Sequence, residues 1–142
     1  MQIARYLILA YNTSKKGMSI LQQQYSFDEK TLGVIEKSCI PYAIFQSVDD
    51  RVVTIAVSDG FCDLYAVSKK EAYDRLNNHL YDSDHPDDVA RLANAVRTFA
   101  TEGGELNVIY RTKIEGIYRI LHLRGKHVYA ANGSRLAVVW YS

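Results

Sequence analysis

The sequence predicts an α+β domain with a five-stranded antiparallel sheet, helices packed on one face, and an additional N-terminal helix. Two runs rich in Val and Ile, Tyr42–Val48 and Val52–Val57, read as a strand pair. Helical patterns follow, and three more runs that read as strands end the chain. Strands near both ends with helices between them are typical of this fold class.

The composition indicates one globular domain. The chain has 142 residues, 48% of them hydrophobic and 23% charged, and a chain of this length buries roughly two-thirds of its unfolded surface. With 17 basic and 16 acidic residues, the net charge is +1. This is too small a positive field to hold nucleic acid or an anionic membrane. We therefore expect no nucleic-acid partner.

Residues 1–25 are interpreted as an extension and linker, and residues 26–142 as the domain. Ile3–Tyr11 is apolar but is interrupted by Arg5, and it is shorter than the roughly 20 residues that span a bilayer. It is either an amphipathic helix or the end of a preceding element, so no direct membrane insertion is expected. Residues 12–24 are polar and read as a linker.

The first helix and the strand pair have local start and stop signals. Ser26 and Glu29 form a capping box, which predicts a helix over Phe27–Ser38 that Pro41 ends. The turn between the two strands is assigned to Asp49-Asp50.

Two shorter helical segments follow the strands. Ser58–Val67 breaks the strand pattern and predicts a short helical turn. Ser68 and Glu71 form a second capping box, which begins a helix that runs to about Asn77. Residues 81–88 then form a polar corner.

The long amphipathic helix is the clearest element. Pro86 suits its first turn, and Asp87 and Asp88 lie at the positive end of its dipole. Apolar residues recur at three- and four-residue steps over residues 89–100. Gly103-Gly104 ends the helix.

The last third of the chain is predicted to be strand. The runs Leu106–Ile114, Ile117–Leu123 and Arg135–Tyr141 are separated by turns at Glu115-Gly116 and Asn132-Gly133. The last two runs are apolar on both sides, so both faces of the sheet are expected to be covered. The long helix covers one face, and the N-terminal helix or a second subunit covers the other.

Four motifs in order resemble the bacterial sensory-box type of PAS domain over residues 40–141. They are the run after the second strand (Val57-Ser58-Asp59-Gly60-Phe61-Cys62-Asp63-Leu64-Tyr65), the helix start Ser68-Lys69-Lys70-Glu71-Ala72, the corner His85-Pro86-Asp87-Asp88, and the hairpin of Tyr110-Arg111 with Glu115-Gly116-Ile117-Tyr118. The family usually carries Asn where this chain has Ser58.

The resemblance implies a non-catalytic sensory domain. Such domains lie N-terminal to diguanylate cyclase or histidine kinase output domains and regulate them. A ligand or partner would act by a population shift. The sequence stops at Ser142, before the Asp-Ile-Thr motif that often leads into the output domain, so we expect that domain to be absent from this chain. We also expect a cytoplasmic homodimer, formed through the N-terminal helix and the outer sheet face.

A small-molecule pocket is predicted where the long helix packs over the sheet, the alternative being a close-packed core without a cavity. The predicted pocket residues are Leu64, Leu76, Leu80, Val89, Leu92, Val96, Val108, Tyr110, Ile120 and His122.

No cofactor is predicted. Haem-binding PAS proteins usually offer a histidine from or near the long helix, and residues 88–102 contain none. Light-sensing flavin chemistry needs a cysteine in the helix before it, and residues 69–86 contain none. Haem and flavin are therefore both disfavoured. Cys39 and Cys62 lack metal-ligand spacing, and no metal site is expected.

The sequence shows no catalytic triad, phosphate-binding glycine loop or paired carboxylates, so the chain is not expected to be an enzyme. Two alternatives stay open. One is a small α+β cavity enzyme in which His122 and Tyr110 form a polar dyad, and the other is a pure dimerisation module.

Overall fold

The computed structural model describes residues 23–49 and 51–142. The predicted helix at Ile3–Tyr11 and nearly all of the predicted linker lie outside the described residues. Asp50, the second residue of the predicted turn, does so as well.

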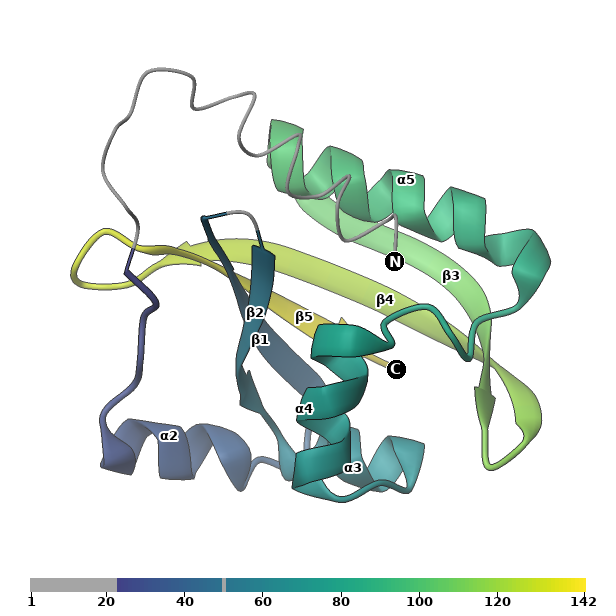
Figure 1. The fold of residues 1–142 in the computed structure, drawn as a ribbon, viewed down its shortest axis with the longest axis horizontal. Helices are drawn as coiled ribbons and strands as arrows, with labels where there is room; N and C mark the ends of the chain where they lie inside the picture. Colours follow the sequence, from purple (N-terminus) through teal and green to yellow (C-terminus); the bar gives the residue numbers. More distant parts are fainter. Residues whose placement is uncertain (1–22, 50) are drawn as a thin grey trace.

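Over these residues, the chain runs through one helix, two strands, three helices and three strands (Figure 1). This order is the predicted one. The elements are α2 (Glu29–Glu36), β1 (Tyr42–Val48), β2 (Arg51–Val57), α3 (Asp59–Tyr65), α4 (Lys69–Asn78), α5 (Pro86–Glu102), β3 (Glu105–Ile114), β4 (Ile117–Tyr129) and β5 (Arg135–Tyr141).

The strands form one five-stranded sheet in the order β2-β1-β5-β4-β3, and every neighbouring pair is antiparallel. The last strand, β5, therefore lies between the first strand and β4. This confirms the predicted α+β class and the antiparallel sheet.

The first helix starts later than predicted. The cap of α2 is Asp28, whose carboxylate accepts hydrogen bonds from the Thr31 backbone N–H and from the Thr31 hydroxyl, both at 2.8 Å. The predicted Ser26–Glu29 box was wrong, because the helix begins two residues later and Asp28, not Ser26, is the residue that caps it. The Ser68–Glu71 box that begins α4 is confirmed.

The fourth strand is longer than predicted, because β4 continues past Leu123 to Tyr129. Gly125 makes this possible: it pairs with Leu106 on one side and Val139 on the other. A Cβ atom at this glycine would lie 3.2 Å from the Leu106 Cβ and 3.4 Å from the Phe99 Cζ. Pairing on both sides therefore extends a strand that the local sequence does not mark.

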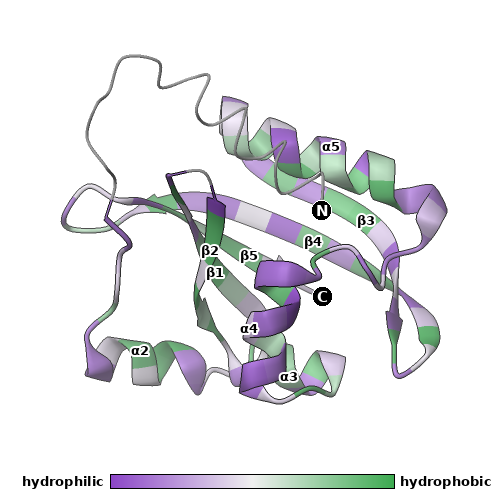
Figure 2. Cartoon of the chain, viewed as in Figure 1, coloured by the Kyte–Doolittle hydropathy of each residue, from purple (hydrophilic) through white to green (hydrophobic). Residues whose placement is uncertain are grey.

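Helices α3, α4 and α5 cover one face of the sheet, here called the inner face (Figure 1). Helix α4 is mostly hydrophilic (Figure 2) and buries only Ala72 and Leu76. Helix α5 buries Leu92 and Phe99 against the same face. The apolar side of the long helix thus packs on the sheet, as the amphipathic pattern predicts.

The opposite, outer face is only partly covered by the described residues. Helix α2 packs Leu32 and Ile35 against Ile44 and Leu136. Over β3 and β4, apolar side chains stay in contact with solvent, with Ile120 73% exposed. The described residues therefore cover the β1–β5 part of this face and leave the β3–β4 part open.

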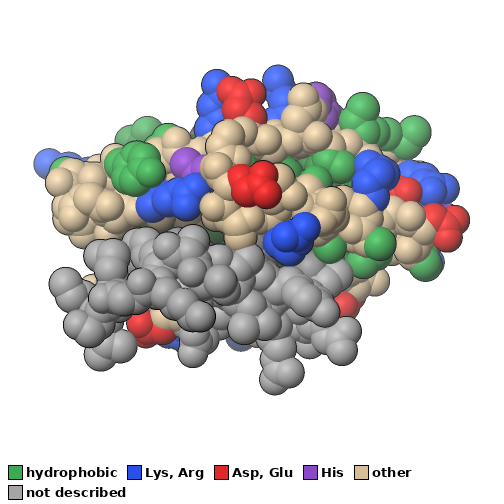
Figure 3. Space-filling model, turned by 90° about the horizontal axis from the view of Figure 1, so that it is seen from above, with side chains coloured by type: hydrophobic (Ala, Val, Ile, Leu, Met, Phe, Trp, Pro, Cys, Tyr) green, Lys and Arg blue, Asp and Glu red, His purple; other side chains and the backbone are tan. Residues whose placement is uncertain are grey.

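On the face shown in Figure 3, Lys and Arg side chains lie among Asp and Glu side chains. None of the helices in residues 23–49 and 51–142 has the length and apolar character needed to cross a bilayer.

Candidate functional site

A cavity of about 160 Å³ lies between α4, α5 and the inner face of the sheet. Five of the ten predicted pocket residues line it: Leu76, Leu80, Leu92, Val96 and Tyr110. They come from α4, the segment after it, α5 and β3. The long helix over the sheet thus encloses a space as well as a packed core.

The other five predicted residues do not line the cavity. Leu64 and Val108 pack in the surrounding core, and Val89 is half-buried on α5. Ile120 and His122 lie on the outer face, where His122 Nε2 is 2.6 Å from the Asn107 Oδ1.

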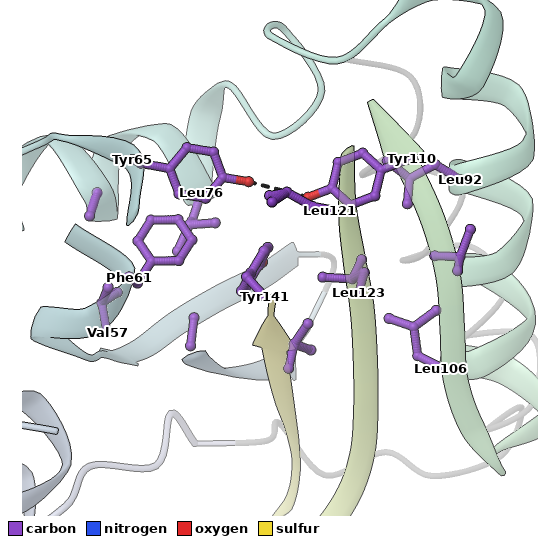
Figure 4. Close-up of a cluster of buried hydrophobic side chains, with 14 of the residues drawn as sticks. Val57, Phe61, Tyr65, Leu76, Leu92, Leu106, Tyr110, Leu121, Leu123 and Tyr141 are labelled. Carbon is purple, nitrogen blue, oxygen red and sulfur yellow. Dashed lines mark hydrogen bonds between the residues drawn. The ribbon is translucent and has the colours of Figure 1, made fainter. Parts of the chain in front are cut away.

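The prediction for Ile120 and His122 was wrong because alternate strand residues point to opposite faces. In β4 it is Leu121 and Leu123 that point inward, beside Tyr110 (Figure 4). Both sides of β4 are apolar in sequence, so hydropathy does not distinguish them.

The same register separates the proposed catalytic dyad. Tyr110 is opposite Leu121 on the inner face, whereas His122 is opposite Ile109 on the outer face. The two side chains therefore lie on opposite sides of the sheet and cannot act on one substrate. The alternative of a cavity enzyme therefore has no catalytic pair in His122 and Tyr110.

Tyrosine hydroxyls meet inside the cavity. Tyr65 from α3 and Tyr110 from β3 point toward one another, with their hydroxyl oxygens 3.2 Å apart (Figure 4). Burial raises the pKa of Tyr65 to about 12, and burial also raises the pKa of Tyr110. Both hydroxyls stay protonated at neutral pH, so this pair is a neutral hydrogen-bonding group.

One end of the cavity carries Arg75, Tyr81 and Asp84. The Arg75 guanidinium lies 4.5 Å from the centre of the Tyr65 ring. Burial raises the pKa of Asp84 to about 6. The Tyr81 hydroxyl is buried and has no hydrogen-bond partner among the described residues. This end therefore combines one weakly acidic carboxyl group with an unused hydroxyl.

The other end carries His127 and Arg135. The His127 ring stacks on Phe99 at 4.0 Å, and its Nε2–H donates to the Phe99 carbonyl oxygen at 3.0 Å. Burial lowers the pKa of His127, so this ring is neutral at neutral pH. Arg135 reaches the Ala100 carbonyl oxygen only at 3.5 Å, and its buried Nε has no partner among the described residues.

The sequence reasoning missed Tyr81, Asp84 and Arg135. Strand period would have found Arg135, because it shares the inner face of β5 with Ala137, Val139 and Tyr141. Tyr81 and Asp84 lie in an irregular corner, where no periodic signal exists.

No family model matches this chain, and no curated protein does either. Solved structures do match it. The PAS domain of the fruit-fly ELK potassium channel is 13% identical over 83% of this chain and 97% of that domain, with a TM-score of 0.63. A sensory box histidine kinase/response regulator from Burkholderia thailandensis is 20% identical over 80% of this chain and 83% of its own, with a TM-score of 0.53. The chain has the PAS fold.

Light-oxygen-voltage domains share this PAS fold. One such domain was solved in a study that used a flavin analogue. It is 14% identical in sequence over 81% of this chain and 84% of that chain, with a TM-score of 0.63. Other light-oxygen-voltage proteins match as well, and so does the blue-light photoreceptor Vivid.

The sequence predicts no cofactor and disfavours flavin. The matches to light-oxygen-voltage domains contradict this prediction, which was wrong. The argument rested on the missing cysteine at residues 69–86. A cysteine is needed for a covalent photochemical step, but a ring can bind without one.

The cavity walls combine apolar side chains with two donors, on Tyr81 and Arg135, that have no partner among the described residues. The cavity volume of about 160 Å³ is close to the ~150 Å³ that holds a single benzene ring. Neither Cys39, which is exposed, nor Cys62 lines the cavity.

Proposed function

We propose that this chain is a PAS-type sensory domain in which a small molecule occupies the cavity between α4, α5 and the sheet. The observation that carries the proposal is a pair of buried donors in the cavity walls, on Tyr81 and Arg135, that find no partner within residues 23–49 and 51–142. Native proteins rarely leave buried polar atoms without a partner. A bound molecule with hydrogen-bonding groups would supply these partners.

The mechanism we propose is a population shift rather than catalysis. A ligand that contacts α5 and the sheet together would favour one arrangement of the two. Separation of His122 from Tyr110 supports a non-catalytic role. Within the described ranges, no cluster of three His, Cys, Asp or Glu side chains could hold a metal ion.

Strand β5 is the proposed route from the cavity to an attached output domain. Its side chains Val139 and Tyr141 line the cavity, and it is the last strand of the fold. We propose a diguanylate cyclase or a histidine kinase as the output. The similarity to a sensory box histidine kinase supports the second of these.

We propose a homodimer formed through the N-terminal segment and the outer sheet face. The exposed Ile109 and Ile120 on that face support it. We keep the division into an extension at 1–25 and a domain at 26–142. The two cysteines are unpaired, which agrees with a cytoplasmic, reducing compartment.

The cavity proposal is tested by filling the space. Val96→Phe places a larger side chain into the cavity from α5. The matched control is Val34→Phe, because Val34 is 76% exposed on α2, away from the cavity. The full chain is purified without denaturant, its folded state is checked by circular dichroism, and the extract after denaturation is analysed by mass spectrometry.

We expect a stoichiometric small molecule in the extracts of the unchanged chain and of Val34→Phe, and its loss from Val96→Phe. An extract of the unchanged chain that contains no such molecule would speak against the proposal. Equal amounts from a folded Val96→Phe variant would also do so.

A further inference from the structure

We propose that the ligand of this cavity is a monocarboxylate with an extended apolar body, and that its carboxylate pairs with Arg135. This inference rests on the proposed ligand-binding function and names the chemistry of the ligand.

The Arg135 side chain presents an unused donor. An arginine Nε–H can only donate a hydrogen bond, and the Nε of Arg135 is buried without an acceptor among the described residues. No carboxylate in the described ranges forms an ion pair with it. A planar guanidinium matches a carboxylate through two parallel N–H···O bonds. The acceptor that this site lacks is therefore an oxyanion.

A structural role for Arg135 does not account for this donor. Its charge lies beside Ala100, near the C-terminal end of α5, where a cation complements the helix dipole. That contact uses a terminal nitrogen of the guanidinium at 3.5 Å. Helix capping explains the position of the charge, but it supplies no acceptor for the Nε–H, and neither does any other described residue.

The charges of the cavity walls favour one carboxylate rather than two. Arg75 and Arg135 are cationic, and Asp84 is the one carboxyl group among the described lining residues. Asp84 and Arg135 belong to opposite ends of the cavity. At the Asp84 end, the charge of Arg75 already acts on the Asp84 carboxyl group, so a second carboxylate on the ligand would meet an already balanced pair and gain little there.

The lining residues extend along most of α5, so an elongated molecule can contact more of them than a compact one. Asp84 lies just before the first residue of α5, Pro86, and Arg135 contacts Ala100 near the last. At the rise of an α-helix, Pro86 and Ala100 are about 21 Å apart. The walls between the two ends are mostly apolar and include Leu92, Val96, Leu106, Leu123 and Val139.

Matched probes separate the charge from the apolar body. Octanoate, its neutral analogue octanamide, and the dicarboxylate octanedioate are titrated into the full chain by isothermal calorimetry, after refolding has removed any bound molecule. A charge-assisted hydrogen bond is worth enough to make octanoate bind about tenfold or more tightly than octanamide. Octanedioate should bind less tightly than octanoate.

Two variants of Arg135 and one control locate the effect. Arg135→Gln should bind octanoate no better than octanamide, while its affinity for octanamide stays unchanged. Arg135→Lys keeps the charge without the guanidinium fork and should recover only part of the preference. The control is Arg124→Gln, because Arg124 is exposed on the outer face of β4 and should keep the full preference.

The outcomes distinguish the two proposals. If octanoate and octanamide bind equally to the unchanged chain, the carboxylate inference fails and the cavity function stands. A folded Arg135→Gln variant that keeps the preference for octanoate would overturn the carboxylate inference in the same way. If no probe binds and native extracts contain no small molecule, both proposals fail.

Discussion

Gly60 shows how one residue without a side chain fixes the start of α3. Its backbone N–H donates to the Ser38 carbonyl oxygen at 2.9 Å. A Cβ atom at this position would overlap the backbone of Cys39 and Ile40. Helix α3 therefore packs backbone against backbone on the segment that follows α2, and only glycine permits this approach.

We predict that Gly60→Ala lowers the free energy of unfolding by about 3 kcal/mol or more, because backbone atoms cannot move aside as a side chain can. The control is Gly33→Ala in α2, where an added Cβ meets nothing within 4 Å. That change should raise stability by about 0.5–1 kcal/mol through helix propensity. Urea denaturation followed by circular dichroism measures both. A Gly60→Ala variant as stable as the unchanged chain would contradict the close approach.

Ser58 shows that a short side chain can hold a junction where the PAS family usually carries Asn. It is fully buried. Its hydroxyl oxygen accepts from the backbone N–H of Phe61 at 3.1 Å and of Tyr42 at 3.0 Å, and it donates to the Ile40 carbonyl oxygen at 2.6 Å. One hydroxyl thus caps α3 and ties it to the start of β1.

Elements are joined across the fold by Asp88 and Arg111. The Asp88 carboxylate, in the first turn of α5, accepts from the Arg111 backbone N–H at 2.8 Å and from its guanidinium at 2.9 Å twice. These bonds hold the pKa of Asp88 well below its usual range, the guanidinium bonds contributing most. The motif His85-Pro86-Asp87-Asp88 therefore serves to fasten α5 to β3.

The lowered pKa predicts a specific acid dependence. A carboxyl group whose pKa is lower in the folded state stabilises the fold above its ordinary pKa of 3.8, and this stabilisation is lost as the pH falls toward the folded value. Asp88→Asn should therefore be less stable than the unchanged chain at neutral pH. The difference between the two should shrink as the pH falls below 3.8.

Urea unfolding over a series of pH values measures this difference. Asp87→Asn is the matched control, because the Asp87 carboxylate is exposed and has no arginine partner among the described residues. It should cost less stability than Asp88→Asn at neutral pH. Curves for Asp88→Asn and the unchanged chain that stay parallel throughout the acid range would contradict the role of this pair.

At the scale of the whole molecule, the uneven cover of the outer sheet face has a consequence for association. Helix α2 covers the part over β2, β1 and β5, while Ile109 on β3 and Ile120 on β4 are 56% and 73% exposed. Fully burying one isoleucine contributes about 1.5–3 kcal/mol. A symmetric dimer contact would bury both side chains in each of the two subunits.

We predict that the full chain is a dimer and that Ile120→Asp converts it to a monomer, since a charge on this face would have to be buried without a partner. Sedimentation equilibrium measures the molar mass. The control Val34→Asp changes an equally exposed apolar residue on α2 and should leave the dimer intact. A monomeric unchanged chain, or a dimeric Ile120→Asp variant, would rule out this interface.

The sequence by itself determined the elements that have strong local signals. Amphipathic spacing identified α5, the Ser68–Glu71 box identified the start of α4, a run rich in Val and Ile indicated β1, and alternation identified β3. Each signal depends on neighbours within a few residues, so it survives without knowledge of the fold. The element order and the PAS-like motifs were enough to predict the fold.

Only the tertiary structure decided which side of each strand meets the helices. Because β4 is apolar on both sides, its facing is set by register with β3 and β5, which puts Leu121 inside and His122 outside. The same long-range pairing brings Arg135 to the end of α5, where its Nε–H meets no acceptor from the part of the chain that the structure describes. Local patterns specify elements, but a site made from several elements exists only once the sheet has paired.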